Sequence, residues 1–230
     1  MRRYGAQMTI SSFDLVGFDL DGTLADTGLD LAMAVNHALA QIDKAPLPEP
    51  TIRSFVGRGV RRTLERSLAA EGVDEPGLVD RLLPAMLDYY AANIAVHSRP
   101  YPGVVAALDA LAAQGARLAV CTNKREGLAR TLLTELGLVD RFTAIIGGDS
   151  LGGVMKPDPA PVQLMIERAG GGRTIFIGDS DNDLGAAHAA GLPCILCDFG
   201  YTDGDLRALG AEAVIDHYDE LVPLLSNWPA

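Results

Sequence analysis

The chain has 230 residues, of which 48% are hydrophobic and 21% are charged, and these proportions are typical of a globular protein. Its 30 Asp and Glu against 19 Lys and Arg give a net charge of -11, so a nucleic-acid partner would meet net repulsion. No apolar run is long enough to span a membrane, and residues 1–12 lack the apolar centre of a secretory signal, so we expect a cytoplasmic protein without membrane contact.

The first predicted strand covers residues 13–20, an apolar run without polar alternation that indicates a buried strand at the centre of a sheet. A segment of different character follows over residues 27–99, where helical periodicity dominates. Helices are predicted there over 29–42, 60–72 and 75–96, and Pro84 is expected to kink or split the last of them. Pro100 and Pro102 then predict a stiff connection back to the sheet.

From Ala116 onward, short apolar runs alternate with helical patterns. Strands are predicted over 116–122, 142–148, 174–179 and 193–197, and helices over 125–137, 159–170 and 184–191. This alternation predicts an α/β fold, a Rossmann-like doubly wound parallel sheet with the helical segment inserted after its first strand. We expect a core domain of residues 12–26 and 100–230, and an inserted helical domain of residues 27–99 that closes over a ligand at the carboxyl edge of the sheet.

Two carboxylates follow the first predicted strand. Asp19 and Asp21 precede Gly22 and Thr23, and a simple turn would account for one Asp and one Gly but not for two acids after a fully apolar strand. Ionised carboxylates this close repel each other and need a cation between them. The pattern therefore favours a functional site.

The strand predicted over 174–179 ends in the same way, with Asp179, Asp181 and Asp183. Read alone, this run is also typical of an acidic helix N-terminus. Because the carboxyl ends of parallel strands meet at one edge, the two acidic segments predict a cage of oxygen ligands. Such a cage suits a hard cation, and Mg²⁺ is favoured where the substrate supplies phosphate oxygens.

Two further loops carry polar residues after apolar runs. Thr122, Asn123 and Lys124 follow one predicted strand, and Lys156 precedes a helix that begins after two prolines. Each pattern is weak by itself, since a threonine in a loop is often a cap and a lone lysine is usually solvated. Together they would bring a hydroxyl donor and a fixed positive charge to the carboxylates.

The three cysteines are an odd and small number, which fits a reducing compartment better than a disulfide framework. The spacing of Cys194 and Cys197 also occurs in redox and zinc sites, but no second Cys or His pair with ligand spacing accompanies it. Both lie in a predicted buried strand, where residues three apart face opposite sides. We interpret them as small buried hydrophobic residues.

In their order and spacing these segments resemble the four motifs of the haloacid dehalogenase superfamily of phosphohydrolases. The matching residues are Asp19 with Asp21, Thr122, Lys156, and Asp179 with Asp183. The helical insertion resembles the cap of that family, and the runs FVGRGVRRTLERSL and SRPYPGV resemble its phosphoglycolate phosphatase branch. Arg125 departs from the branch, which often has proline there.

The resemblance implies that Asp19 is a nucleophile that forms an aspartyl-phosphate, and that Asp21 protonates the leaving alkoxide and then activates water. It implies Mg²⁺ held by the Asp19 side chain, the Asp21 main-chain carbonyl and Asp179, with Asp183 acting through water or from outside. Lys156 would offset negative charge. The residues expected to hold the substrate are Thr122, Gly22, Thr23, Asn123 and Arg58.

Arg58 is the first choice for a substrate carboxylate, because it lies between two glycines and arginine favours bidentate carboxylate contacts. Arg61 and Arg62 are the next choices, although arginines on such a helix are more often solvated or paired with acids such as Glu65.

The expected function is that of a magnesium-dependent phosphomonoester hydrolase for a small soluble phosphoester, 2-phosphoglycolate first. A sugar-phosphate phosphatase and a phosphomutase stay open as alternatives, as does, from another class, a catalytically silent regulatory or ligand-binding protein. A haloacid dehalogenase is disfavoured because that chemistry needs neither Mg²⁺ nor Asp21. The sequence leaves a monomer and a homodimer open.

Overall fold

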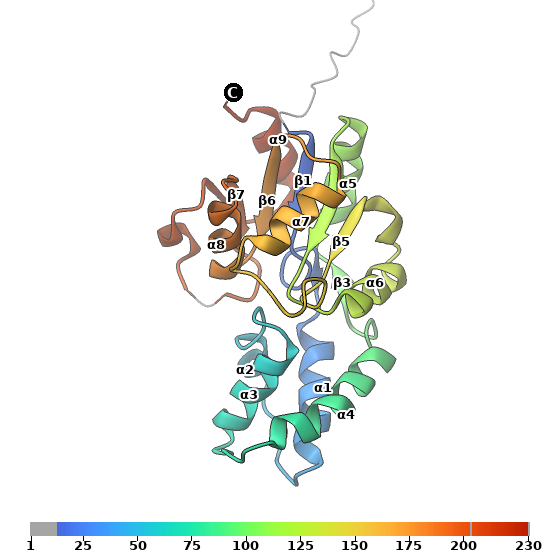
Figure 1. Cartoon of the computed structure of the whole chain (residues 1–230), viewed down its shortest axis with the longest axis vertical. Helices are drawn as coiled ribbons and strands as arrows, with labels where there is room; N and C mark the ends of the chain where they lie inside the picture. Colours follow the sequence, from blue (N-terminus) through green and yellow to red (C-terminus); the bar gives the residue numbers. More distant parts are fainter. Residues whose placement is uncertain (1–12, 203, 230) are drawn as a thin grey trace, which may run out of the picture.

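The computed structural model describes residues 13–202 and 204–229. Within them lies a six-stranded sheet with the order β5-β4-β1-β6-β7-β8, and every neighbouring pair is parallel (Figure 1). Its strands are β1 (Leu15–Phe18), β4 (Arg117–Cys121), β5 (Ala144–Ile146), β6 (Thr174–Gly178), β7 (Cys194–Cys197) and β8 (Ala213–Ile215). The predicted parallel sheet is confirmed, and its first strand is central, as expected.

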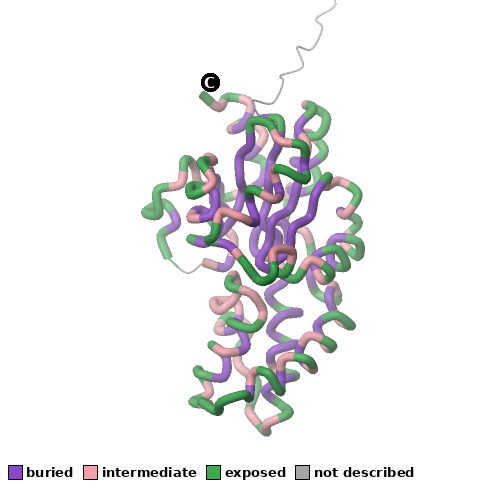
Figure 2. The backbone as a smooth tube through the Cα atoms, viewed as in Figure 1, coloured by how far each residue is buried: buried purple, intermediate pink, exposed green. Residues whose placement is uncertain are grey.

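Helices cover both faces of this sheet (Figure 1). They are α5 (Val104–Ala113), α6 (Glu126–Glu135), α7 (Ala160–Arg168), α8 (Asp181–Ala189) and α9 (Leu221–Ser226). Side chains of a strand alternate between faces, so Val16 and Phe18 pack in one buried cluster with α5, α6 and α9, while Leu15 packs in the other with α7 and α8. Figure 2 shows the central strands of the sheet buried between these layers. The doubly wound architecture is therefore confirmed.

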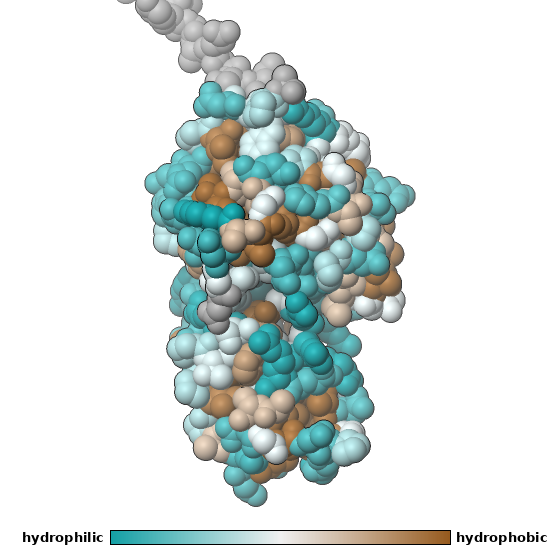
Figure 3. Space-filling view, turned by 90° about the vertical axis from the view of Figure 1, so that its left-hand side faces the viewer, coloured by the Kyte–Doolittle hydropathy of each residue, from teal (hydrophilic) through white to brown (hydrophobic). Residues whose placement is uncertain are grey.

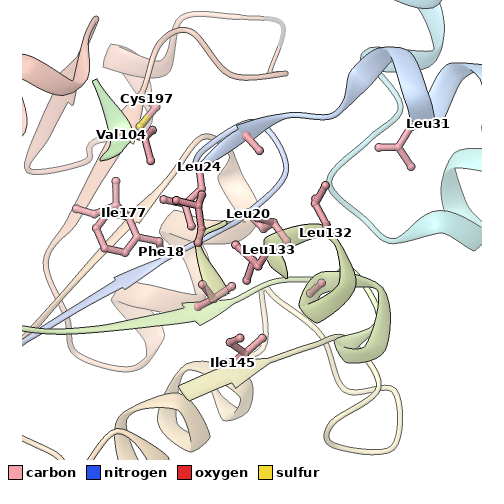
Figure 4. Close-up of a cluster of buried hydrophobic side chains, with 14 of the residues drawn as sticks. Phe18, Leu20, Leu24, Leu31, Val104, Leu132, Leu133, Ile145, Ile177 and Cys197 are labelled. Atoms are coloured by element: carbon pink, nitrogen blue, oxygen red, sulfur yellow. The ribbon is translucent and has the colours of Figure 1, made fainter. Parts of the chain in front are cut away.

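The apolar packing continues beyond the end of β1. Phe18, Leu20 and Leu24 come from β1 and the loop after it, and they lie in one cluster with Leu132 and Leu133 of α6 (Figure 4). All of these side chains are fully buried. This packing fixes the backbone of the loop that carries Asp19 and Asp21.

The two cysteines of β7 face opposite sides of the sheet, since Cys197 packs in the cluster of Val16 and Cys194 in the cluster of Leu15. Both are buried, and both are free thiols, as is Cys121. The interpretation of the pair as small buried hydrophobic residues is confirmed.

Four helices lie beyond the carboxyl end of β1 and form the lower part of the molecule in Figure 1. They are α1 (Gly28–Ala40), α2 (Glu49–Arg53), α3 (Val60–Ala70) and α4 (Leu78–Ala92). Helix α4 continues through Pro84, so the expected split does not occur. Helix α2 was not predicted because of its prolines, yet Pro50 lies in its first turn, where a missing N–H costs nothing.

Two segments of the chain join the helical part to the sheet, and these segments pair with each other. Strands β2 (Ala25–Asp26) and β3 (Arg99–Pro100) pair antiparallel. The buried carboxylate of Asp30, in the first turn of α1, accepts hydrogen bonds from the His97 N–H (3.0 Å), the Ser98 N–H (2.8 Å) and the Ser98 hydroxyl (2.7 Å). The outgoing and returning chains are thus held together where the molecule narrows (Figure 3).

Among the described residues, no helix has the length and apolar character needed to cross a membrane. The short elements β2, β3, β8 and α9 were not predicted. Strand β8 in particular is only partly buried at the edge of the sheet, which weakens its apolar signal.

Candidate active site

The acidic segments meet at the point where the topology of the sheet reverses. From β1 the chain continues to β4 and β5 on one side, and β6 then returns to the other side of β1. The loops after β1 and β6 diverge at such a point and leave a crevice, where open α/β sheets bind ligands. Asp19 follows β1 and Asp179 follows β6, so the crevice lies between these two aspartates.

Three buried carboxylates come together there. Asp19, Asp179 and Asp183 each offer an oxygen, and these oxygens lie within 4.8 Å of one another. Lys156 stands among them, with its Nζ 3.0 Å from Asp19 Oδ1 and donating to Asp183 Oδ1 (2.6 Å) and to the carbonyl of Cys121 (2.7 Å). Burial lowers the pKa of Lys156, but Asp183 and Asp19 outweigh it and raise that pKa above its usual value. One fixed cation thus faces three carboxylates.

The carboxyl group of Asp19 is poorly satisfied. Burial raises its pKa to about 6, with contributions from Asp183 and Asp21, against the lowering effect of Lys156. Within the described residues its buried Oδ1 accepts no hydrogen bond, and its one close cation is Lys156, with Nζ at 3.0 Å. An orphaned carboxylate oxygen beside two further buried carboxylates fits a hard divalent cation such as Mg²⁺.

Asp179 is held by two hydrogen bonds, and its carboxylate oxygens can still accept further hydrogen bonds or bind a cation. Its Oδ1 accepts from the Thr23 hydroxyl (3.2 Å) and its Oδ2 from the Tyr201 N–H (2.8 Å), one bond for each oxygen. Gly22, at φ +86°, approaches so closely that a Cβ there would collide with the Asp179 carboxylate, and Gly200 approaches it from the other side. Gly22 and Thr23, predicted at the substrate, are therefore placed against Asp179.

Asp183 accepts four hydrogen bonds, three of them at Oδ2. Its Oδ2 accepts from the Ser180 N–H (3.1 Å), the Ser180 hydroxyl (2.6 Å) and the Asp179 N–H (3.2 Å), while Oδ1 accepts from Lys156. Ser180 and Asp183 form the capping box of α8. The acidic run is thus a helix N-terminus and part of the site at once, so both interpretations of it apply.

Asp21 lies apart from these three carboxylates and has its own cation. Lys124 Nζ donates to Asp21 Oδ1 (2.8 Å) and Oδ2 (3.0 Å), and the Thr27 hydroxyl donates to Oδ1 (2.6 Å). Lys124 also donates to the hydroxyl of Tyr90 (2.7 Å), which belongs to α4 of the helical part. Burial lowers the pKa of Lys124, but Asp21 outweighs it and keeps this residue charged.

The loop after β4 supplies the other predicted residues. Thr122 is buried, and its hydroxyl oxygen accepts from the Lys124 N–H (3.2 Å). The side chain of Asn123 accepts from the Lys156 N–H (2.9 Å) and donates to the Lys156 carbonyl (3.0 Å) and to the Gly57 carbonyl (2.9 Å). Asn123 therefore joins the Lys156 loop to the helical part.

Asp21 faces a cavity of about 40 Å³ between the sheet and the helices. It is mainly apolar on the helical side, and its charged residues come from the sheet side. Those that line it are Asp21, Lys124, Arg125 and Leu128 from the core, and Leu31, Val56, Gly57, Gly59, Val60, Thr63 and Tyr90 from the helices. The enclosed volume holds only a few water molecules.

Arg58 does not line this cavity. It is largely exposed and pairs with Asp181 across the junction at 3.0 Å, beside an open groove of about 560 Å³ that Arg62 and Arg66 also line. The structure therefore brings Asp19, Asp21, Thr122, Lys156, Asp179 and Asp183 to one crevice and leaves Arg58 at its rim.

Several polar residues of the crevice were not predicted. Lys124 was noted but given no role, and Thr27, Tyr90 and Tyr201 were not singled out. Lys124 had a signal in the sequence, because it follows Thr122 and Asn123 after the same strand. Tyr90 had none, since only the packing of α4 against the sheet brings it there.

The site is therefore that of an α/β protein of the doubly wound class, with buried carboxylates and a lysine at its switch point and a layer of helices beside it. A family model described as haloacid dehalogenase-like hydrolase matches residues 16–197. The chain belongs to this family.

The sequences of known relatives match this chain over nearly its whole length. A phosphoglycolate phosphatase of Mesorhizobium japonicum is 43% identical, and the match covers 93% of this chain and 95% of that protein. A phosphoglycolate phosphatase of Caulobacter vibrioides is also 43% identical, with 94% of this chain and 93% of that protein covered. The crystal structure of a predicted phosphoglycolate phosphatase from Haemophilus somnus superposes with a TM-score of 0.85 at 30% identity, covering 96% of this chain and 99% of that one. The expected class, a phosphatase of this family with a small phosphoester as substrate, is confirmed.

Proposed function

We propose that the chain is a magnesium-dependent phosphatase of 2-phosphoglycolate. The observation that carries this proposal is the cluster of Asp19, Asp179 and Asp183 around Lys156, because it combines an unsatisfied carboxylate, a cation site and a fixed positive charge. The substrate is supported by the relatives, whose similarity extends over the helical part as well as the sheet. The net charge of -11 and the three free cysteines support a cytoplasmic enzyme without a nucleic-acid partner.

Mg²⁺ would be held by the Asp19 carboxylate, the Asp21 main-chain carbonyl and Asp179, which keeps acceptor capacity. Asp183 accepts three hydrogen bonds at Oδ2 and one from Lys156 at Oδ1, so we assign it to the orientation of Lys156 and to a place outside the direct ligands of the ion. When bound, the ion would offset the negative charge of the phosphate oxygens, so that an anionic nucleophile can approach the phosphorus atom.

In the first step an oxygen of Asp19 attacks phosphorus and the ester P–O bond breaks, which leaves an aspartyl-phosphate. The departing alkoxide takes a proton from Asp21. In the second step Asp21 removes a proton from water, which attacks the same phosphorus and releases phosphate and the Asp19 carboxylate. Lys156, 3.0 Å from Asp19, compensates the charge that builds up on the phosphoryl oxygens.

Thr122 and backbone N–H groups near Gly22 and Asn123 would hold those oxygens. In the described part of the chain the Thr122 hydroxyl accepts a hydrogen bond but donates none, so its proton is available to a phosphoryl oxygen. The loss of one such donor costs about 3 to 4 kcal/mol of barrier.

Residues 27–99 would form the cap that excludes water from this chemistry, and the Asp21 cavity would receive the part of the substrate that leaves. Arg125 lines that cavity beside Lys124, which makes it a better placed partner for a carboxylate than Arg58. Arg58 stays a prediction from the sequence.

The test is a comparison of kcat/KM for 2-phosphoglycolate with sugar phosphates and nucleotides. We expect 2-phosphoglycolate to be preferred by at least about tenfold, the effect of one lost ionic contact. A preference for sugar phosphates would reject the substrate, and turnover of a sugar phosphate to its isomer would indicate a phosphomutase. Asp19→Asn should abolish hydrolysis of every ester, and a variant that keeps its activity would reject the mechanism.

A further inference from the structure

Tyr90 connects the helical part of the molecule to the predicted general acid. It lies in α4, is 1% exposed, and its hydroxyl accepts a hydrogen bond of 2.7 Å from Lys124, which follows β4. The other donations of Lys124 go to the two oxygens of Asp21, at 2.8 and 3.0 Å. An ammonium group has three protons, so these contacts use its full capacity.

This arrangement is buried. The side chain of Lys124 is 4% exposed and that of Asp21 is 12% exposed. A charged donor that loses a partner in such a place is costly, because no water replaces it. Without the Tyr90 hydroxyl, Lys124 would have to turn toward another acceptor, and its hold on Asp21 would change with it.

The second side chain that donates to Asp21 also lies where the sheet meets the helical part. Thr27 precedes α1, and its hydroxyl reaches Asp21 Oδ1 at 2.6 Å, while its N–H donates to the Tyr201 hydroxyl. Asp21 is thus fixed from two sides, by a residue at the start of the helical part and by a lysine that α4 holds in place. The direction of its carboxyl group therefore depends on where the helices sit.

We propose that Tyr90 and Lys124 are positioning residues that couple the closed arrangement of the helices to the placement of Asp21 for proton transfer. The proposal rests on the function proposed above, in which Asp21 protonates the leaving alkoxide. Tyr90, from α4, and Lys124, from the loop after β4, both line the cavity that the leaving group would enter, so their contact bridges the helices and the sheet at that cavity. Proton donation would then await closure of the cap.

The test compares two leaving groups. An alkoxide such as glycolate needs a proton as it departs, whereas 2,4-dinitrophenolate does not. The kinetic constant is kcat/KM, because it covers the steps up to departure of the leaving group and excludes hydrolysis of the aspartyl-phosphate. The variant is Tyr90→Phe, which keeps the ring in its buried place and removes only the hydroxyl.

We expect Tyr90→Phe to lower kcat/KM for 2-phosphoglycolate by about tenfold, the usual effect of a hydrogen bond to a charged group, and to change it for 2,4-dinitrophenyl phosphate by less than about twofold. Lys124→Gln should show the same selectivity with a larger loss. Tyr89→Phe is the matched control, since Tyr89 is the preceding residue and its ring stacks on His37 instead. It should behave like the parent enzyme with both esters.

Asp21→Asn separates this proposal from the one on which it rests. If Asp21→Asn lowers kcat/KM for 2,4-dinitrophenyl phosphate as much as for 2-phosphoglycolate, the acid role of Asp21 is wrong. If Asp21→Asn is selective but Tyr90→Phe and Lys124→Gln lower both constants equally or leave both unchanged, the coupling is rejected and the contact is only structural. Should Tyr90→Phe fail to fold, the selectivity of Lys124→Gln decides.

Discussion

Lys156 joins two aspartates that have different tasks. Its Nζ donates to Asp183 at 2.6 Å and lies 3.0 Å from Asp19, and all three side chains are at most 10% exposed. Asp183 accepts four hydrogen bonds, whereas Asp19 Oδ1 accepts none from the part of the chain that the structure describes. Asp183 therefore holds the lysine in place, and the lysine brings a positive charge to the proposed nucleophile Asp19.

Lys156→Met should damage both stability and activity. It leaves Asp183 and Asp19 without their cation in a buried place, and removal of one partner from a buried ion pair costs about 3 to 5 kcal/mol. We expect a fall of that size in the free energy of unfolding, measured by urea denaturation, and loss of aryl phosphatase activity. Lys156→Arg, which keeps the charge, should recover most of the stability. Equal destabilisation by both variants would mean that charge compensation is not what Lys156 provides.

Asp179→Asn and Asp183→Asn should differ in their dependence on Mg²⁺. Asp179 retains acceptor capacity and is proposed as a ligand, so its loss should abolish activity at any accessible Mg²⁺ concentration. Asp183 acts through its neighbours, and loss of such outer partners weakens metal affinity by about 10- to 100-fold. Titration of activity with Mg²⁺ should therefore show a rightward shift for Asp183→Asn. Identical curves for the two variants would contradict this division of roles.

Much of the fold could be predicted from the sequence because its signals are local. An apolar run such as residues 13–20 is buried on both faces of a sheet, and Asp19 and Asp179 then follow from parallel strands whose ends must meet. Helix α2 and strand β8 were missed for physical reasons. Proline in a first helical turn looks like a breaker, and a half-buried edge strand lacks a continuous apolar run.

The contacts between the helices and the sheet could not be predicted. Arg58 was chosen for its chemistry, but docking of the helices points it at Asp181, and Tyr90 reaches Lys124 across a long separation in sequence. No local pattern encodes such pairs, because they depend on how two packed bodies meet. Asp183 was predicted as part of the site, yet its hydrogen bonds to Ser180 and Lys156 became visible only in the structure.

Removal of metal should lower stability as well as activity. The oxygens of three buried carboxylates lie within 4.8 Å of one another, and Lys156 offsets only part of their repulsion. A ligand at 100 times its dissociation constant stabilises the folded state by about 2.7 kcal/mol. We therefore expect a higher melting temperature with Mg²⁺ than with EDTA. In Asp19→Asn, which removes one charge and one ligand, the EDTA-treated protein should melt higher than the parent and gain less from Mg²⁺. An ion-independent melting temperature in the parent would count against the site.

Arg125 and Arg58 can be separated by a substrate that lacks the carboxylate. Both side chains are exposed, but Arg125 lines the Asp21 cavity, whereas Arg58 lies outside it and pairs with Asp181. Exposed ion pairs contribute about 0 to 1 kcal/mol, so Arg58→Ala should change KM by only a few-fold.

Arg125→Ala should raise KM for 2-phosphoglycolate by about tenfold, the effect of one lost ionic hydrogen bond, and leave KM for ethyl phosphate unchanged. The comparison of both esters cancels any general effect on the phosphate site, which ethyl phosphate occupies equally well. If Arg58→Ala instead raises KM for 2-phosphoglycolate alone, the carboxylate must be bound from the rim of the junction. In that case the helices would have to shift, so that Arg58 leaves Asp181 and binds the carboxylate of the substrate instead.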